Sequence, residues 1–209
     1  GEDYPIKIIK TNDDGHFIIA ANTTSNDLDV GDSFGDGDAW LFEIDDHSGN
    51  IIHSEVFGGS KNETLWDALL LENNHLILVG SSLSDDYNVP LNYGETDGWL
   101  LEVDPAWSII NSKVYGGPRN DHFDSIKKVS DGFILVGSSL STSIDLPDNA
   151  NLSGSNIWVL KLNELRSKVW SKAYGGSKSE YATEIAVVNN EQLVIFGTTL
   201  SNDGDVGNL

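Results

Sequence analysis

The side chains of this sequence that could do chemistry are mostly carboxylates. Of 209 residues, 33 are Asp or Glu and only 12 are Lys or Arg, so the formal net charge is -21. Because binding to nucleic acid or to an anionic membrane surface needs clusters of Lys and Arg, neither is an expected partner. The sequence contains no Cys, which excludes disulfides, thiolate metal sites and Cys nucleophiles. The chemistry that remains is cation binding or acid–base catalysis by carboxylates.

Four segments concentrate these acids and contain neither Lys nor Arg: 22–37, 81–96, 138–155 and 198–209. Asp and Asn oxygens at alternate positions are ligands that Ca²⁺ accepts, and Ca²⁺ is therefore the candidate cofactor. The candidate metal ligands are Asp27, Asp29, Asp36, Asp38, Asp203 and Asp205. The favoured alternative is an Asx turn, because the Gly and distal Glu of an EF-hand are missing. In such turns Asp29, Asn88, Asp145 and Asp205 would bond the backbone two residues on and anchor the aliphatic residue that follows.

The same segments carry aromatic residues. Exposed aromatic rings beside Asp and Asn are typical of sugar-binding sites, although three aromatics in some fifty residues is not a specific signal. The candidate ligand-binding residues are Phe34, Asp85, Asp86, Tyr87, Asn88 and Tyr93.

The elements that position these segments recur at a fixed spacing. The octet starting at Asp38 is repeated at Asp97 and again at Asn156, so both steps are 59 residues long. Self-similarity of this kind is the signature of a repeat architecture. We predict one repeat domain over residues 1–209. Its repeats are expected at about 2–59, 60–117 and 118–176, with a partial fourth repeat at about 177–209, which makes about 3.5 repeats.

Each repeat is expected to contain four short strands, which in the second repeat are 65–71, 75–80, 97–103 and 108–115. The second strand is apolar on both faces and must be covered on both. Four-stranded repeats of about 58 residues favour an all-β fold of the β-propeller type, with a β-solenoid as the alternative. A fixed strand topology would place all four acidic segments on the same side, where they would form one acidic rim.

Two recurring features are expected to serve the fold. An acid stands four residues after the second Gly of each aromatic-Gly-Gly turn, at Glu63, Asp121 and Glu180, and we expect it to cap backbone N–H groups of the turn. A small residue follows the apolar strand each time, at Ala21, Gly80, Gly137 and Gly197. Crowding near a ring axis or another close approach of backbone would explain it.

Together these motifs resemble the tandem repeats of secreted and cell-surface proteins of bacteria, many from the Bacteroidetes, and of some archaea. The resemblance rests on the aromatic-Gly-Gly-Ser turn with its acid, the strand at 131–137, the loop at 201–206 and the Asp-x-Trp strand. It covers essentially the whole chain, although the third repeat departs from it with Ser143 and Asn156. The resemblance implies a propeller-like module of a larger exported protein, located outside the cell or at its surface.

Enzyme motifs are weak in comparison. A propeller glycosidase of the sialidase type would resemble its relatives in clamping a carboxylate with three arginines, and only Arg119 and Arg166 are present. We therefore expect a non-enzymatic binding or display module that uses its acidic loop face. The expected partners are a glycan or another surface protein, with self-association or continuation of the repeat array as further options. A carbohydrate-active hydrolase and a purely structural spacer are the alternatives. No apolar run reaches the ~18 residues that a membrane helix needs, so no membrane insertion is expected.

Overall fold

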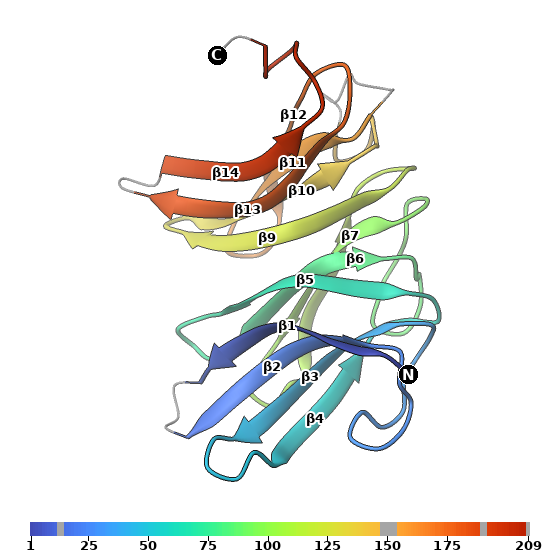
Figure 1. Cartoon of the computed structure of the whole chain (residues 1–209), viewed down its shortest axis with the longest axis vertical. Helices are drawn as coiled ribbons and strands as arrows, with labels where there is room; N and C mark the ends of the chain where they lie inside the picture. Colours follow the sequence, from blue (N-terminus) through green and yellow to red (C-terminus); the bar gives the residue numbers. More distant parts are fainter. Residues whose placement is uncertain (12–14, 147–153, 189–191, 208–209) are drawn as a thin grey trace. The chain divides into compact units, whose positions relative to one another are not determined.

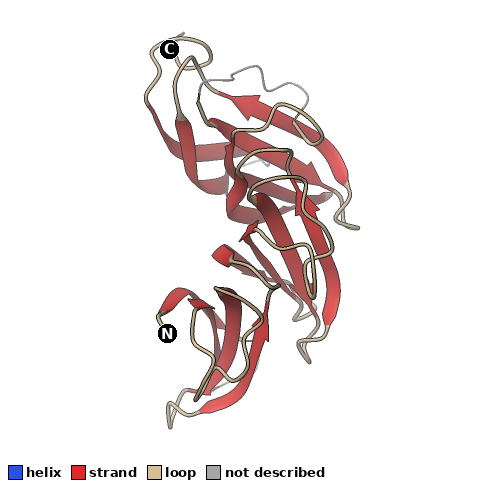
Figure 2. Cartoon of the chain, turned by 90° about the vertical axis from the view of Figure 1, so that its right-hand side faces the viewer, coloured by secondary structure: helices blue, strands red, loops and turns tan. Residues whose placement is uncertain are grey.

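The computed structural model describes residues 1–11, 15–146, 154–188 and 192–207. This part of the chain consists of strands and loops without helices, and its strands form antiparallel sheets (Figures 1 and 2). Consequently it also has no helix that is long and apolar enough to span a membrane. The all-β prediction is confirmed. The described residues form no closed barrel, and closure into a propeller stays a prediction.

Each complete repeat forms one sheet in which four strands lie side by side in chain order. The first sheet contains β1 (Asp3–Lys10), β2 (His16–Thr23), β3 (Asp38–Asp45) and β4 (Ile51–Phe57). The second contains β5 (Glu63–Leu70), β6 (Leu76–Ser82), β7 (Asp97–Val103) and β8 (Ile109–Tyr115). The third contains β9 (Asp121–Val129), β10 (Gly132–Ser139), β11 (Asn156–Leu162) and β12 (Lys168–Tyr174). The fourth repeat provides two strands, β13 (Glu180–Val188) and β14 (Gln192–Thr199). The strands predicted for the second repeat agree with β5 to β8 within two residues.

The chain divides into two compact units, Gly1–Asn92 with Trp99–Val114 and Tyr93–Gly98 with Tyr115–Leu209. In the first unit, the first and second sheets bury a common core that includes Ile18, Leu41, Leu78 and Leu101. In the second unit, Val136 and Val159 of the third sheet pack with Ala182 and Ile185 of β13. In the three complete repeats the apolar second strand is an inner strand of its sheet. Of these strands, β6 and β10 are buried along their whole length.

The small residue of the second strand lies opposite a β-bulge of the first strand. In the third sheet, Gly137 pairs with both Trp158 and Phe123, and the register of β9 shifts at this point. The two rings stack over the glycine with centroids 4.5 Å apart. A β-carbon at Gly137 would collide with the backbone carbonyl of His122. Close backbone approach at a bulge thus accounts for the small residue without any appeal to a ring axis.

Candidate functional site

The recurring Trp of the third strand positions the acidic loop of its own repeat. In the first repeat the Trp40 indole N–H donates to Ser54 Oγ at 2.9 Å, and this hydroxyl donates to the backbone carbonyl of Asp29 at 2.8 Å. In the second repeat Trp99 donates to Ser112, which donates to the carbonyl of Asn88. The buried indole therefore has its hydrogen-bond partner, and the same hydroxyl fixes the middle of the loop.

Asp and Asn side chains of the loops bind the aromatic-Gly-Gly turn of the preceding repeat. Asn88, Asp145 and Asp205 occupy the same repeat position, and each accepts a hydrogen bond from the first Gly N–H of that turn. The donors are Gly58 at 3.0 Å, Gly116 at 3.1 Å and Gly175 at 3.0 Å. The backbone N–H groups of Asn88, Asp145 and Asp205 also donate, each to the carbonyl of the glycine that its side chain binds. We call this pair of hydrogen bonds the inter-repeat latch.

Neighbouring loop positions add further bonds to the same turn. Asp86 accepts from the Ser60 N–H at 2.7 Å, and Asp203 accepts from the Ser177 N–H at 2.8 Å. These backbone hydrogen bonds hold the pKa of both exposed carboxyl groups below its ordinary value. In the second, third and fourth repeats the Ser that opens the motif accepts one more backbone N–H, as Ser84 does from Lys61 at 2.9 Å. The latch and these neighbouring side chains together provide acceptors for the backbone N–H groups of the glycine-rich turn.

The prediction that these Asp and Asn side chains stabilise the fold is supported. The predicted Asx-turn geometry is wrong where the structure shows another hydrogen-bond partner for the side chain. The side chains of Asn88 and Asp205 bond the Gly-Gly turn of the preceding repeat and not their own backbone two residues on. Asp145 bonds the equivalent turn, and the residue two positions after it lies outside the described residues. The aliphatic residue that follows is anchored as predicted in three repeats, since Val30, Val89 and Leu146 are buried.

In the first loop the corresponding residues meet no Gly-Gly turn among the described residues. Asp27 and Asp29 are exposed, and among the described residues their carboxylates have no hydrogen-bond partner. Asp36 is also exposed and donates its backbone N–H to Lys61 O at 3.0 Å. Asp38, in contrast, is fully buried. Within the part of the chain that the structure describes, no three His, Cys, Asp or Glu side chains form a group that could hold a metal ion. Calcium binding by the candidate ligands therefore stays a prediction.

The acid after each Gly-Gly turn caps the turn as predicted. Glu63 accepts from the Gly59 N–H at 2.5 Å, Asp121 from Gly117 at 2.7 Å and Glu180 from Gly176 at 2.9 Å. Each is buried, at 1% exposure or less. Hydroxyl groups of the second strand and the loop complete their shells, as Ser139 and Ser141 do for Asp121. Because these carboxylates are occupied by the fold, they are poor candidates for catalysis.

A second buried carboxyl group stands against the same turn. Asp38 Oδ2 accepts the Phe34 N–H at 2.8 Å, and Asp97 Oδ2 accepts the Tyr93 N–H at 2.6 Å. The other oxygen of each, Oδ1, is buried without a hydrogen-bond partner among the described residues. Burial raises the pKa of Asp97 to about 7, with a smaller contribution from the negative charge of Asp121. Burial also raises the pKa of Asp38. These two acids fix the end of the loop that carries the aromatic residue.

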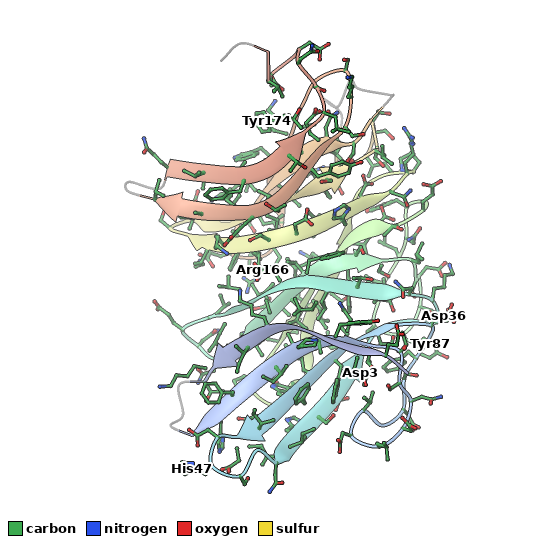
Figure 3. All side chains as sticks on the ribbon, in the orientation of Figure 1. Asp3, Asp36, His47, Tyr87, Arg166 and Tyr174 are labelled. Carbon is green, nitrogen blue, oxygen red and sulfur yellow. The ribbon has the colours of Figure 1, made fainter. Side chains whose placement is uncertain are left out.

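Of the candidate ligand-binding residues, the structure brings two aromatic rings together. Phe34 and Tyr87 come from the loops of successive repeats in the first unit, and their ring centroids are 5.3 Å apart. Both are exposed, by 38% and 71%. Figure 3 shows Tyr87 and Asp36 on the loop side of this unit. Asp85 lies 3.6 Å from the Lys61 amine, whereas Asp86 and Asn88 are engaged in bonds to the Gly-Gly turn. Tyr93 belongs to the second unit.

The residue directly before Asp29, Asn88, Asp145 and Asp205 adopts a left-handed conformation. Its φ is +54° at Leu28, +48° at Tyr87, +64° at Ile144 and +64° at Gly204. Only the fourth repeat uses glycine, although this backbone region costs other residues about 1–2 kcal/mol. The side chains are solvent-facing, with Leu28 exposed by 93%. Three of the four loops thus present an apolar side chain at a strained position.

Replacing Leu28 with Gly is therefore expected to raise the free energy of unfolding by about 0.5–1 kcal/mol. The substitution relieves the left-handed strain and removes almost no packing, although glycine returns part of the gain as unfolded-state entropy. Urea unfolding of the two proteins measures the difference. Leu28→Ala is the control, because alanine keeps the strain and should give no gain. A loss of stability in Leu28→Gly would contradict the interpretation.

Sequence reasoning missed the serines and the direction of the latch. Ser54, Ser112 and Ser171 follow the Trp of their repeats by 14, 13 and 13 residues, and each accepts the indole N–H. This spacing was visible in the sequence. The latch was not, because Asn88 and Gly58 are 30 residues apart and belong to different repeats.

Comparison with known proteins adds no family to these observations. No protein-family model matches this sequence, and the search of curated proteins finds no match either.

Proposed function

We propose that this chain is a non-enzymatic, propeller-type repeat module that works outside the cell and uses its loop face as a binding or display surface. Sheets of four strands in chain order, each packed face to face with the next sheet of its unit, are the building blocks from which propellers are made. The repeated sequence motifs and the resemblance to exported repeat proteins support the extracellular setting.

A role without catalysis is favoured by what the repeated acids already do. Glu63, Asp121 and Glu180 cap the Gly-Gly turns, and Asn88, Asp145 and Asp205 form the latches. A carboxylate that accepts several hydrogen bonds from the fold is a poor general base. A hydrolase is the alternative, and hydrolysis of a polysaccharide panel by the purified protein would support it instead.

The observation that carries the binding surface is the Phe34–Tyr87 pair. Two exposed rings with centroids 5.3 Å apart stand on loops whose carboxylates Asp27, Asp29 and Asp36 are also exposed. Aromatic faces stack on the apolar faces of sugar rings, and nearby carboxylates accept hydrogen bonds from hydroxyl groups or hold Ca²⁺. A neutral or cationic glycan is the ligand class that fits this surface and the strongly negative chain.

Glycan binding measured in millimolar Ca²⁺ and in EDTA tests this function. The double variant Phe34→Ala/Tyr87→Ala should lose at least about tenfold in affinity, because most of the apolar contact area disappears. Tyr181→Ala, which removes another exposed tyrosine, should bind as the parent protein does. Asp27→Ala/Asp29→Ala should abolish calcium-dependent binding and leave the fold intact.

A thermal melt of the protein without glycan tests calcium binding separately from glycan binding. Calcium at a hundredfold over its dissociation constant should stabilise the protein by about 2.7 kcal/mol, and the Asp27/Asp29 variant should not respond. If no glycan or ion binds, or if the aromatic variant binds unchanged, the loop face is not a binding site and the structural spacer is the better interpretation.

A further inference from the structure

A polar pocket of about 240 Å³ lies in the first unit, where the first and second sheets meet. This volume is below the roughly 300–1,000 Å³ of pockets that hold drug-sized molecules, so the pocket fits a smaller ligand. The described residues that line it include no Lys or Arg. Side chains from both sheets contribute, namely Glu2, Tyr4, Thr24, Asn62 and Thr64, together with the backbone of Gly37.

Tyr4 is directed toward the second sheet. It lies opposite Asn22 in the pairing of β1 with β2, so the two side chains are on the same face of the first sheet. Asn22 is fixed on that face, because its Oδ1 accepts the Leu65 N–H at 2.7 Å and its Nδ2 donates to the Leu65 carbonyl at 3.1 Å. Tyr4 is nevertheless exposed by 54%. The pocket therefore has an accessible aromatic ring beside a fixed polar wall.

The pocket offers both acceptors and donors of hydrogen bonds. The Tyr4 hydroxyl donates to Glu2 Oε2, and this bond together with the charge of Glu2 raises the pKa of Tyr4, so the phenol stays protonated. Asn62 Nδ2 donates to Thr64 Oγ1 at 3.1 Å. Among the described residues, these bonds leave Glu2 Oε1 and Asn62 Oδ1 as acceptors and the Thr64 hydroxyl hydrogen as a donor.

These groups match the chemistry of a sugar ring. Each sugar hydroxyl both donates and accepts, and the apolar face of the ring stacks on an aromatic side chain such as Tyr4. The Glu2 carboxylate repels a sugar that carries its own carboxylate. The same carboxylate forms a charge-assisted hydrogen bond with the ammonium group of an amino sugar.

We propose that this pocket binds one neutral or amino monosaccharide residue, with its ring on Tyr4 and its hydroxyl groups bonded to Glu2 and Asn62. The inference deepens the loop-face function proposed above and rests on it for the ligand class. Gly37 of the pocket and Phe34 of the ring pair belong to the same loop. Figure 3 shows Asp3, the residue between Glu2 and Tyr4, on the same side of the first unit as Asp36 and Tyr87.

Titration of the full chain with three free sugars in EDTA tests the proposal. The probes are glucosamine, glucose and glucuronate, and backbone amide chemical shifts measure affinity and location. Shifts should concentrate at residues 2–4, 22–24 and 62–64. Glucosamine should bind at least about threefold more tightly than glucuronate, because the two probes differ in the sign of their charge beside Glu2. Glu2→Gln should remove this preference and keep glucose binding.

Substitution of Tyr4 tests the stacking surface. Tyr4→Ala should weaken glucose binding at least about tenfold, whereas Tyr4→Phe keeps the ring and should retain most of the affinity. Tyr181→Ala is the matched control, since Tyr181 occupies the position of Tyr4 in the fourth repeat and is exposed by 45%. Thermal unfolding of each variant should stay close to that of the parent, because these tyrosines are exposed.

Three outcomes overturn the proposal: no shift with any of the three sugars, shifts confined to other residues, or equal binding by Tyr4→Ala and the parent protein. The Phe34→Ala/Tyr87→Ala variant keeps the two tests apart, because it should bind the free sugars as the parent does while it loses the longer glycan. Glycan binding that needs Phe34 and Tyr87 but not Tyr4 would leave the loop-face function standing without this pocket. Monosaccharide binding that needs Tyr4, without glycan binding by the ring pair, would do the reverse.

Discussion

Replacing Asp97 with Asn is expected to raise the free energy of unfolding at about pH 8 by about 2–4 kcal/mol. Asp97 is fully buried, its Oδ1 has no hydrogen-bond partner among the described residues, and the Asp121 carboxylate faces the same glycine. A β-carbon at Gly116 would collide with Asp97 Oδ1 and would also crowd Asp121 Oδ2, so the two carboxyl groups flank one α-carbon. An ionised Asp97 would therefore be a buried charge beside a like charge.

The pH dependence follows from the direction of the shift. The pKa of Asp97 is about 7 in the folded state, above its ordinary value of 3.8. The folded state therefore keeps a proton that the unfolded chain releases. This contribution to stability is complete below about pH 4 and is lost as the pH rises through about 7. The raised pKa values of Asp38 and Asp121 act in the same direction.

Asn is the appropriate replacement because the third repeat already uses it. Asn156 stands at the position of Asp97 and contacts Gly175 in the same way, without a charge. There the pKa of the facing Glu180 is lowered, because hydrogen bonds from Ser201, Gly176 and Thr199 outweigh its burial. Asp97→Asn should therefore keep the shape of the junction and remove the charge of one of the two carboxyl groups that flank the α-carbon of Gly116.

Urea unfolding between about pH 5 and pH 8 measures this effect. The parent protein should lose stability over this range, and Asp97→Asn should lose most of that slope. Asp85→Asn is the matched control, since this exposed acid should change stability by no more than about 0.5 kcal/mol at any pH. An Asp97→Asn protein that is less stable at pH 8 and keeps the slope would show that Asp97 is already ionised in the folded protein at about pH 5.

Replacing Asp145 with Ala should cost about 1–3 kcal/mol, whereas the same change at Asp29 should cost less than about 0.5. Both occupy the same repeat position, but among the described residues Asp145 binds a Gly-Gly turn and Asp29 does not. Its removal leaves the buried Gly116 N–H without the acceptor it has at 3.1 Å. Asp29 is exposed and forms no latch. The comparison separates the latch from any general effect of charge.

Asp145→Asn distinguishes the hydrogen bond from the ion pair of Asp145 with Lys168. Asn88 performs the latch role in the second repeat, so Asn at position 145 should retain most of the stability that Ala loses. Equal losses in Asp145→Ala and Asp29→Ala would mean that the latch contributes nothing. Chemical unfolding in EDTA keeps calcium out of the comparison.

Local patterns in the sequence were sufficient for the strands and for the role of the turn acids. Side chains alternate between the two faces of the strand around Trp99, and a Gly-Gly turn marks the end of each complete repeat. These patterns predicted β5 to β8 to within two residues. Glu63, Asp121 and Glu180 cap a turn only four residues away. Interactions over so few residues depend on local backbone geometry, which sequence spacing describes well.

The partner of each loop acid was decided only by the tertiary structure. Asn88 and Gly58 are 30 residues apart in the sequence and are hydrogen-bonded in the structure. The packing of successive sheets determines whether a loop Asp or Asn contacts a turn, a metal ion or solvent. Among the described residues, two closely similar motifs lie in different environments, since Asp205 forms a latch and Asp29 does not. The raised pKa of Asp97 likewise depends on burial against Gly116 and Asp121. The sequence by itself thus determined the repeating strands. The packing of successive repeats decided which acids are structural and which remain exposed, because hydrogen bonding and desolvation depend on residues that are distant in the chain.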